Sequence, residues 1–348
     1  GVHANGTVFE SSNRWREASL VRWHDGSMRP VGGWTTRKAS AFSYAPRAMI
    51  AYLDNSSDEH MVAGTYEKLY YVNPSLTVTD ITPSSGFTSG SLSGALNTGF
   101  GGGFYGLTNY GRAPSNSGVY AEATTWALDT WGEYLLAVSS TDGKLLEWQG
   151  NVNANAATVA NAPTGNNSMV VTEERFVFCL GAGGNPRKVA WSDKENNTVW
   201  NATATNEAGD MELQTTGQIM CGVRMRGATL ILTDTDAHIA TYSGAPFVYG
   251  FQRVGTACGV ASRKGAVAID EGAFWMGKKG FFTFDGSTAK EIPCEVADYI
   301  FDDMNPAQVS KVYAVHNSQF GEIWWFYPSA SSNENDRYVT LDYKEGHW

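Results

Sequence analysis

The segment Asp234-Thr-Asp236-Ala-His238 is the part of this sequence that most resembles a metal site. Alternating carboxylates along a loop are typical of calcium binding, but a calcium loop also needs a glycine at the turn and a late bidentate glutamate. Both are missing here. The apolar runs LIL before the cluster and IATY after it place the cluster between two strands. We therefore expect a solvated hairpin turn and no metal.

Motifs of several enzyme classes are incomplete. No GxSxG nucleophile elbow appears, and the similar stretches GFTSG and GSLSG within 86–94 lie in low-complexity sequence. Gly277-Lys-Lys-Gly280 is too short for a phosphate-binding loop, and Ser140-Thr-Asp142-Gly143 lacks the continuation of a sialidase-type Asp box. The 35 acidic residues leave a two-carboxylate hydrolase open. None of these patterns singles out a catalytic residue, so we expect no enzyme activity and no cofactor.

The cysteines and histidines do not indicate a metal site either. Cys179, Cys221, Cys258 and Cys294 form no CxxC pair, and the six histidines are scattered along the chain. Free cysteines are among the most often buried residues. We expect four reduced thiols inside the fold.

Positive charge is concentrated near the N-terminus. Residues 14–38 carry a net charge of +4 in a chain of net charge −10, which leaves −14 for the remainder. The basic residues of this segment are Arg14, Arg16, Arg22, Arg29, Arg37 and Lys38. One interpretation is attraction to an acidic neighbouring subunit or to DNA phosphates, and the other is an ordinary strand pair with outward arginines. Trp15, Trp23 and Trp34 in the same segment are candidates for core or interface anchors.

The acidic remainder bears on nucleic-acid binding. Phosphate recognition needs clustered Lys and Arg, so a body of charge −14 argues against a sequence-reading or DNA-packaging protein. It suits a wall past which DNA slides without adhering.

Composition predicts an all-β fold. The chain has 348 residues, 38 glycines and only 17% charged residues, with 12 Trp, 16 Tyr and 16 Phe. Aromatic residues favour pleated, half-buried surfaces, and glycine favours turns. No stretch reads as a long amphipathic helix, and no apolar run approaches the roughly 18 residues of a membrane span.

A repeated hairpin pattern runs along the chain. Six units, each an apolar run, a polar turn and a second apolar run, begin at residues 61, 134, 176, 230, 274 and 323. Further apolar runs precede three of them, at 168–172, 219–224 and 265–270. Spacing of roughly 40–50 residues with about four strands per unit is typical of a β-propeller. We expect five or six blades.

The largest interval contains an insertion at 84–118, with 10 glycines in 35 residues. A loop of this length is usually functional or disordered. Its aromatic residues favour docking, on another subunit in our interpretation, and the alternative is a solvated linker. These residues are Phe87, Phe100, Phe104, Tyr105 and Tyr110.

The expected organisation is an N-terminal arm at 1–40, holding closing strands, and a propeller body at 41–348. The arm would complete the last blade or reach a neighbouring subunit. The chain stops at Gly346-His347-Trp348 directly after an expected strand, which suggests truncation at the C-terminus.

Several segments resemble the hub or nozzle proteins of short bacteriophage tails. They are NGTVFESSNRWREASLVRWHDGSMRPVGGW at 5–34, GTYEKLYYVN at 64–73 with DITP at 80–83, WSDKENNTVWN at 191–201, GFFTFDG at 280–286, and EIWWFYPSASSNENDRYVTLDY at 322–343. The resemblance spans most of the chain, and the insertion at 84–118 is where this sequence departs from it.

The resemblance implies a virion structural protein with a propeller-like fold. Copies would form a ring, expected to be a hexamer, below the portal and adaptor, in contact with other tail proteins. Double-stranded DNA would be retained there and later leave through the channel without sequence-specific binding. The location would be the phage tail, after assembly in the cytoplasm of the bacterial host.

Two other functions stay open at this stage. A secreted or viral propeller that binds glycans or proteins would use aromatic loops as platforms. A propeller glycosidase would turn over a sialoside or polysaccharide and lose that activity when a carboxylate pair is mutated.

Overall fold

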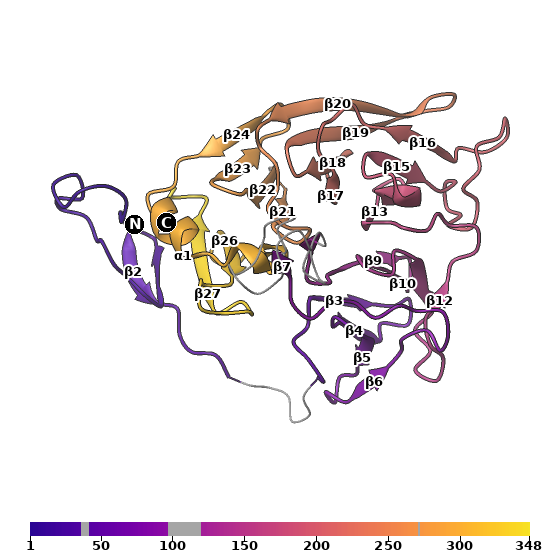
Figure 1. Ribbon diagram of the computed structural model, residues 1–348, viewed down its shortest axis with the longest axis horizontal. Coiled ribbons are helices and arrows are strands. Elements are labelled where there is room, and N and C mark those ends of the chain that lie inside the picture. Colours follow the sequence, from indigo (N-terminus) through magenta and orange to yellow (C-terminus); the bar gives the residue numbers. More distant parts are fainter. Residues whose placement is uncertain (36–41, 97–119, 271) are drawn as a thin grey trace, which may run out of the picture.

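The structure is a computed structural model that describes residues 1–35, 42–96, 120–270 and 272–348. Six antiparallel sheets surround a central axis, which confirms the expected β-propeller (Figure 1). We number the sheets blades 1 to 6 in chain order. Each hairpin predicted from the sequence forms the second and third strands of one blade. The apolar runs at 168–172, 219–224 and 265–270 contain innermost strands.

Blade 1 consists of β3 (Ala48–Leu53), β4 (Glu59–Gly64), β5 (Leu69–Val72) and β6 (Val78–Asp80). Blade 2 consists of β9 (Trp126–Trp131), β10 (Tyr134–Ser139), β11 (Leu145–Trp148) and β12 (Ala157–Thr158). Blade 3 consists of β13 (Ser168–Val171), β14 (Val177–Leu180), β15 (Lys188–Trp191) and β16 (Gly209–Glu212).

Blade 4 consists of β17 (Ile219–Met225), β18 (Ala228–Thr233), β19 (Asp236–Gly244) and β20 (Val248–Thr256). Blade 5 consists of β21 (Ala266–Ile269), β22 (Gly272–Met276), β23 (Phe281–Phe284) and β24 (Ala289–Ile292). Blade 6 has three strands, β25 (Tyr313–Asn317), β26 (Glu322–Tyr327) and β27 (Arg337–Asp342).

The remaining elements belong to none of the six blade sheets. They are the hairpin β1 (Val21–His24) and β2 (Ser27–Pro30), the pair β7 (Ala95–Leu96) and β8 (Tyr120–Ala121), the helix α1 (Ala297–Asp303), and the 3₁₀ turns η1 (Ala182–Gly184) and η2 (Pro306–Lys311). β1 and β2 pair with each other and not with β27.

Neighbouring blades pack through apolar clusters because their middle strands are buried on both faces. In β10, Leu135 and Ala137 belong to the cluster shared with blade 1, whereas Leu136 and Val138 belong to the cluster shared with blade 3. Successive side chains of a strand point to opposite faces, so one continuous apolar run serves two interfaces. Such clusters fill five interfaces between consecutive blades.

The sixth interface, between blades 6 and 1, has no such cluster among the described residues. Instead, Glu334 from the β26–β27 loop accepts hydrogen bonds from Arg47 at the start of β3 and from Lys311 at the end of η2. The Arg47 Nη2–Glu334 Oε1 distance is 2.8 Å, and the Lys311 Nζ–Glu334 Oε1 distance is 3.0 Å. We call this interface the seam.

The base of the insertion lies across one mouth of the ring. Gly94 and the Gln308 side chain exchange hydrogen bonds of 3.0 and 2.9 Å, and Arg47 donates to the Leu92 carbonyl at 3.0 Å. Arg47 and Gln308 precede the innermost strands of blades 1 and 6. Glu122, which follows β8, pairs with Arg263 just before the innermost strand of blade 5. Figure 1 shows β7 near the centre of the ring.

Candidate assembly interface

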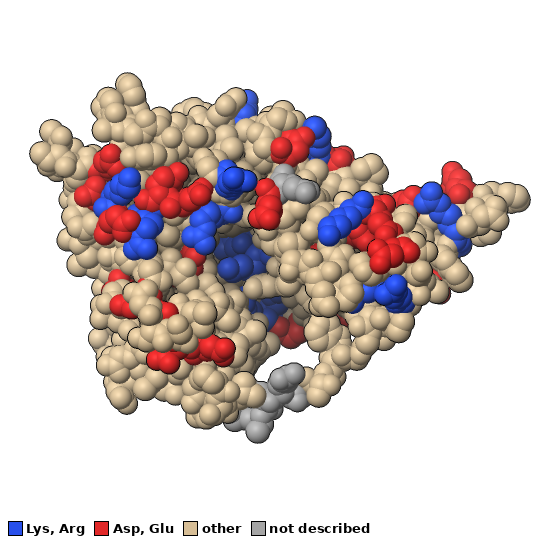
Figure 2. Space-filling view, turned by 180° about the vertical axis from the view of Figure 1, so that it is seen from behind, with Lys and Arg blue, Asp and Glu red and all other residues tan. Residues whose placement is uncertain are grey.

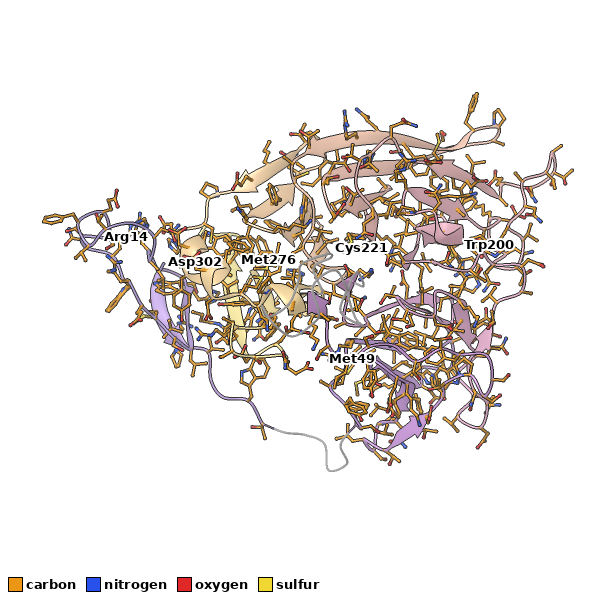
Figure 3. All side chains as sticks on the ribbon, in the orientation of Figure 1. Arg14, Met49, Trp200, Cys221, Met276 and Asp302 are labelled. Atoms are coloured by element: carbon orange, nitrogen blue, oxygen red, sulfur yellow. The ribbon has the colours of Figure 1, made fainter. Side chains whose placement is uncertain are left out.

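The N-terminal arm, residues 1–35, is attached to the outside of the propeller. The N–H groups of Ala4 and Asn5 donate to the carbonyl of Glu295 at 2.9 Å, and Arg14 Nη1 lies 2.7 Å from the Glu295 carboxylate. Figure 3 shows Arg14 at the periphery, beyond Asp302 of α1. The arm therefore has a defined position, although it lies outside the ring of blades.

A buried ion pair fixes the β1–β2 hairpin to blade 6. Arg22 Nε and Nη2 donate to the two carboxylate oxygens of Glu322 at 2.9 and 3.1 Å. The guanidinium carbon lies 3.6 Å from the centre of the Phe320 ring, and Trp324 Nε1 donates to the same carboxylate at 2.9 Å. Arg22 is therefore committed to its own chain and is not an outward cation.

The arm exposes large apolar side chains to solvent. The Phe9 side chain is 92% exposed and that of Trp34 is 73% exposed. The complete set on the arm is Val8, Phe9, Trp15, Leu20, Met28 and Trp34. Clusters of exposed apolar residues are typical of protein interaction sites.

The loop that carries Val8 and Phe9 is held in shape by polar contacts. A carboxylate oxygen of Glu10 accepts a hydrogen bond from the Thr7 N–H at 2.7 Å, and Arg16 donates to the Ser11 hydroxyl at 3.0 Å. A preorganised loop loses less conformational entropy when it binds. Phe9 is thus exposed on a loop that hydrogen bonds hold in place.

A cavity of about 520 Å³ lies between the arm and blade 6. Trp34 forms one wall and meets Trp324 edge to face, with ring centroids 6.2 Å apart. Val315 and Phe326 of blade 6 also line the cavity. The Trp34 side chain therefore borders a concave surface of mixed polar and apolar character, which also includes Arg22 and His316.

The seam exposes a second apolar surface, on blade 1. Met49 and Leu53 of the innermost strand β3 are 51% and 61% exposed. In the other five interfaces, residues of the innermost strands face an adjacent blade. A cavity of about 490 Å³ lies at the Leu53 end of blade 1, with Ala51, Met61 and Val72 in its lining.

The structure distributes the interface residues predicted in the arm over three environments. Arg14 and Arg22 form ion pairs within the chain, Trp23 is partly buried, and Arg29 is exposed. Arg16 stabilises the Phe9 loop, whereas Trp15 and Trp34 face solvent. Arg37 and Lys38 lie outside the described residues.

The aromatic residues predicted in the insertion are described only in part. Phe87, in the insertion, stacks on Trp126 in blade 2 of the same chain, with ring centroids 5.7 Å apart. The docking of Phe87 is therefore within the chain. Phe100, Phe104, Tyr105 and Tyr110 lie outside the described residues.

The expected hairpin turn is present at Asp234-Thr235, between β18 and β19, but the expectation that the cluster at 234–238 is solvated was wrong. Asp236 and His238 are buried, and Asp236 Oδ1 accepts a hydrogen bond from Thr215 at 2.9 Å and contacts His238 Nε2 at 3.1 Å. Burial lowers the pKa of His238. The cluster is a hydrogen-bonded network within blade 4. In the described part of the chain, no group of three or more His, Cys, Asp or Glu could hold a metal ion.

The four cysteines are free thiols, as expected, and Cys294 alone is only partly buried. Burial raises the pKa of Cys221 to about 12 and that of Cys258 to about 11. Such thiols remain protonated near neutral pH and are poor nucleophiles.

Sequence reasoning missed the seam and its three charged residues. Arg47 and Glu334 are 287 residues apart, and no local pattern links them. The strand β3 gave no signal either, because the apolar residues of AMIAYL do not alternate with polar ones and the exposure of one face is not visible in the sequence.

No protein-family model matches the chain, and no match was found among curated proteins. Among solved structures, BBS1N in complex with ARL6DN is 10% identical, with 88% of this chain and 81% of that chain covered and a TM-score of 0.47. Virginiamycin B lyase from Staphylococcus aureus is 7% identical, with 84% and 82% covered and a TM-score of 0.44. At these values the similarity says nothing about what this chain binds or does. No helix in the described residues is long and apolar enough to cross a membrane.

Proposed function

We propose that this chain is a structural subunit of a short bacteriophage tail, which assembles with copies of itself into a ring that meets the portal and adaptor. The resemblance of the segments at 5–34 and 322–343 to hub and nozzle proteins suggests this class of protein. The observation that carries the proposal is the exposed apolar surface of the arm, because Val8, Phe9 and Trp15 have no packing partner adequate to bury them within one described chain.

In this proposal DNA passes along the axis of the ring of copies and not through a single propeller. The base of the insertion, bonded to Gln308 and Arg47, lies across one mouth of the propeller, and we therefore assign the DNA path to the ring of copies. The net charge of −10 suits a DNA path with little adhesion. The role of the arm is mechanical attachment, since Arg14 and Arg22 are already neutralised by Glu295 and Glu322.

Mass photometry of the full chain tests the assembly part. We expect rings for the wild type and at least about tenfold weaker assembly when Phe9 and Trp15 are both replaced by Ser, because apolar anchors dominate interface energies. Phe247→Ser is the matched control, since Phe247 is 80% exposed in the β19–β20 turn, away from the arm. Equal assembly of the double variant and the wild type would contradict the role of the arm.

Electron microscopy of virions with antibody labelling tests the phage part. The expected result is label on a narrow segment of the tail. A chain that is absent from virions, stays monomeric and binds oligosaccharides would instead favour the glycan-binding alternative.

A further inference from the structure

The central hollow of the propeller is lined by basic side chains, although the molecule as a whole is acidic. Figure 2 shows Lys and Arg side chains on the wall of the hollow, seen from the face opposite to that of Figure 1. The innermost strands of the blades form this wall, and three of them, β9, β17 and β21, hold or closely follow charged residues. These residues are Asp129, Arg224 and Lys264.

Asp129 supplies a single negative charge near the two cations. Its two carboxylate oxygens accept hydrogen bonds from the N–H groups of Thr130 at 2.8 Å and Val171 at 2.9 Å. The Arg224 Nη2–Asp129 Oδ1 distance is 3.8 Å, and Arg224 Nη1 reaches the Val171 carbonyl only at 3.4 Å. The Arg224 guanidinium therefore keeps most of its hydrogen-bonding capacity for another acceptor.

Lys264 immediately precedes the innermost strand of blade 5. Within the described part of the chain, its ammonium group has no hydrogen bond and no ion pair, and the residue is partly exposed. Burial lowers the pKa of Lys264, and the negative charge of Asp129 partly offsets that decrease. The positive charges of Lys264 and Arg263 partly offset the rise in the pKa of the Cys221 thiol that burial causes. Figure 3 shows Cys221 near the centre of the ring.

The other nearby cations are already paired. Arg263 donates to Asn167 Oδ1 at 2.9 Å and pairs with Glu122, whereas Arg47 and Lys311 share Glu334. Because the base of the insertion crosses one mouth, the hollow is open toward the face seen in Figure 2. Arg224 pairs only loosely with Asp129, at 3.8 Å, and its side chain is 45% exposed, so Arg224 and Lys264 keep donors available to an anion that enters the hollow.

We propose that the central hollow binds a compact oxyanion, a phosphate or a carboxylate group, through Lys264 and Arg224. Two cations face one carboxylate that is bound to backbone N–H groups, so the wall carries a net positive charge that an anion would neutralise. An ammonium and a guanidinium supply the donors that oxyanions accept in charge-assisted hydrogen bonds. This site is independent of the arm and of ring assembly.

Thermal unfolding of the full chain in the presence of inorganic phosphate or citrate, at constant ionic strength set with sodium chloride, tests the site. We expect a saturable rise in the unfolding midpoint of the wild type with at least one of the two, because a ligand that binds only the folded state stabilises it. The two probes distinguish phosphate from carboxylate recognition. Isothermal titration calorimetry gives the affinity directly.

Lys264→Met and Arg224→Gln are each expected to raise the Kd for the anion at least about tenfold, because each variant loses at least one charge-assisted hydrogen bond. Lys264→Met should not lower the midpoint without ligand, because it removes a partly buried, unpaired charge. Arg226→Gln is the matched control, since Arg226 is exposed in the turn after β17, and it should bind as the wild type does.

Three results would overturn the proposal. The first is no effect of phosphate or citrate on the wild type beyond that of sodium chloride. The second is an equal loss of binding in Arg226→Gln. The third is binding of a 20-base-pair DNA duplex without binding of either small anion, which would indicate diffuse surface attraction.

Discussion

Blades 4 and 5 are held together by apolar side chains, whereas blades 6 and 1 are joined by the ion pair of Glu334 with Arg47, and Lys311, which precedes β25 of blade 6, bonds the same carboxylate. Trp275, Leu232 and Phe284 are completely buried in the first interface. In the seam, Met49 and Leu53 are more than half exposed, although they occupy the innermost strand of blade 1. Among the described residues, therefore, this ring is closed where its two ends meet by specific polar contacts and not by general apolar burial.

The two kinds of interface should respond differently to solvent. Apolar burial is nearly independent of pH, whereas an ion pair depends on the ionisation of its carboxylate. Regions with few buried apolar contacts also open locally at lower free-energy cost. The seam is therefore the expected site of the first local opening of the propeller.

Trp275→Ala should have the largest effect on stability. The side chain is completely buried, and its Nε1 donates to the Cys258 carbonyl at 2.7 Å. Replacement by alanine leaves a cavity and an unpaired carbonyl, which costs about 3–5 kcal/mol in the free energy of unfolding. Urea unfolding measures the loss. Trp15→Ala is the control and should stay within about 0.5 kcal/mol, because Trp15 is exposed.

Glu334→Gln should destabilise the seam. The change leaves Arg47 and Lys311 side by side without a carboxylate, in positions where both are buried. Breaking a fully buried pair costs about 3–5 kcal/mol, and we expect about 2 kcal/mol here because the Glu334 side chain is 42% exposed. Glu195→Gln, which breaks the surface pair with Arg175, should cost less than about 1 kcal/mol. Equal losses in urea unfolding would contradict a special role of the seam.

Gly94→Ala should disturb the base of the insertion. A Cβ at this position would lie 2.0 Å from the carbonyl oxygen of Ala307, so backbone must move. Such overpacking costs about 1–2 kcal/mol. Gly33→Ala is the control, because nothing lies within 4 Å of its Cβ position. Urea unfolding of the two variants, with hydrogen exchange at η2, distinguishes a local from a global effect.

Acid should loosen the seam before the other interfaces. Burial alone would raise the pKa of Glu334, but hydrogen bonds from Arg47 and Lys311 outweigh it and lower the pKa. A carboxyl group with a depressed pKa stabilises the folded state above its unfolded pKa of about 4.3 and loses that contribution as the pH falls through the folded value. Hydrogen exchange in β3 and β25 should therefore accelerate below about pH 4 while β13 stays protected. Glu334→Gln should show the faster exchange already at pH 7, and unchanged exchange in both would rule out this mechanism.

Phe9→Ser should have the smallest effect on the stability of the single chain. Phe9 contributes almost no buried area within one chain, so the change stays within about 0.5 kcal/mol in urea unfolding of the monomer. Its effect should appear only in assembly. A large loss of monomer stability would mean that Phe9 is buried in solution.

The repeating architecture was accessible from the sequence because its signals are local. Each of the six predicted hairpins is an apolar run, a turn and a second apolar run, and each became the middle of a blade. The run YLLAVS illustrates the reason, since its residues 135–138 are buried alternately against the two neighbouring blades. The burial of Asp236 could not be predicted, because nothing in the turn-like sequence around it indicates a hydrogen bond from Thr215.

By itself, the sequence determined the fold class, the approximate number of blades and the position of the insertion, because alternation and turn chemistry act over a few residues. Tertiary structure alone decided which charged residues meet. Glu334 joins Arg47 across 287 residues, and Arg22 joins Glu322 across 300. Tertiary structure also decided that β1 and β2 pair with each other and leave blade 6 with three strands. Contacts between distant segments depend on how the ring closes in space, and no spacing within the chain encodes that closure.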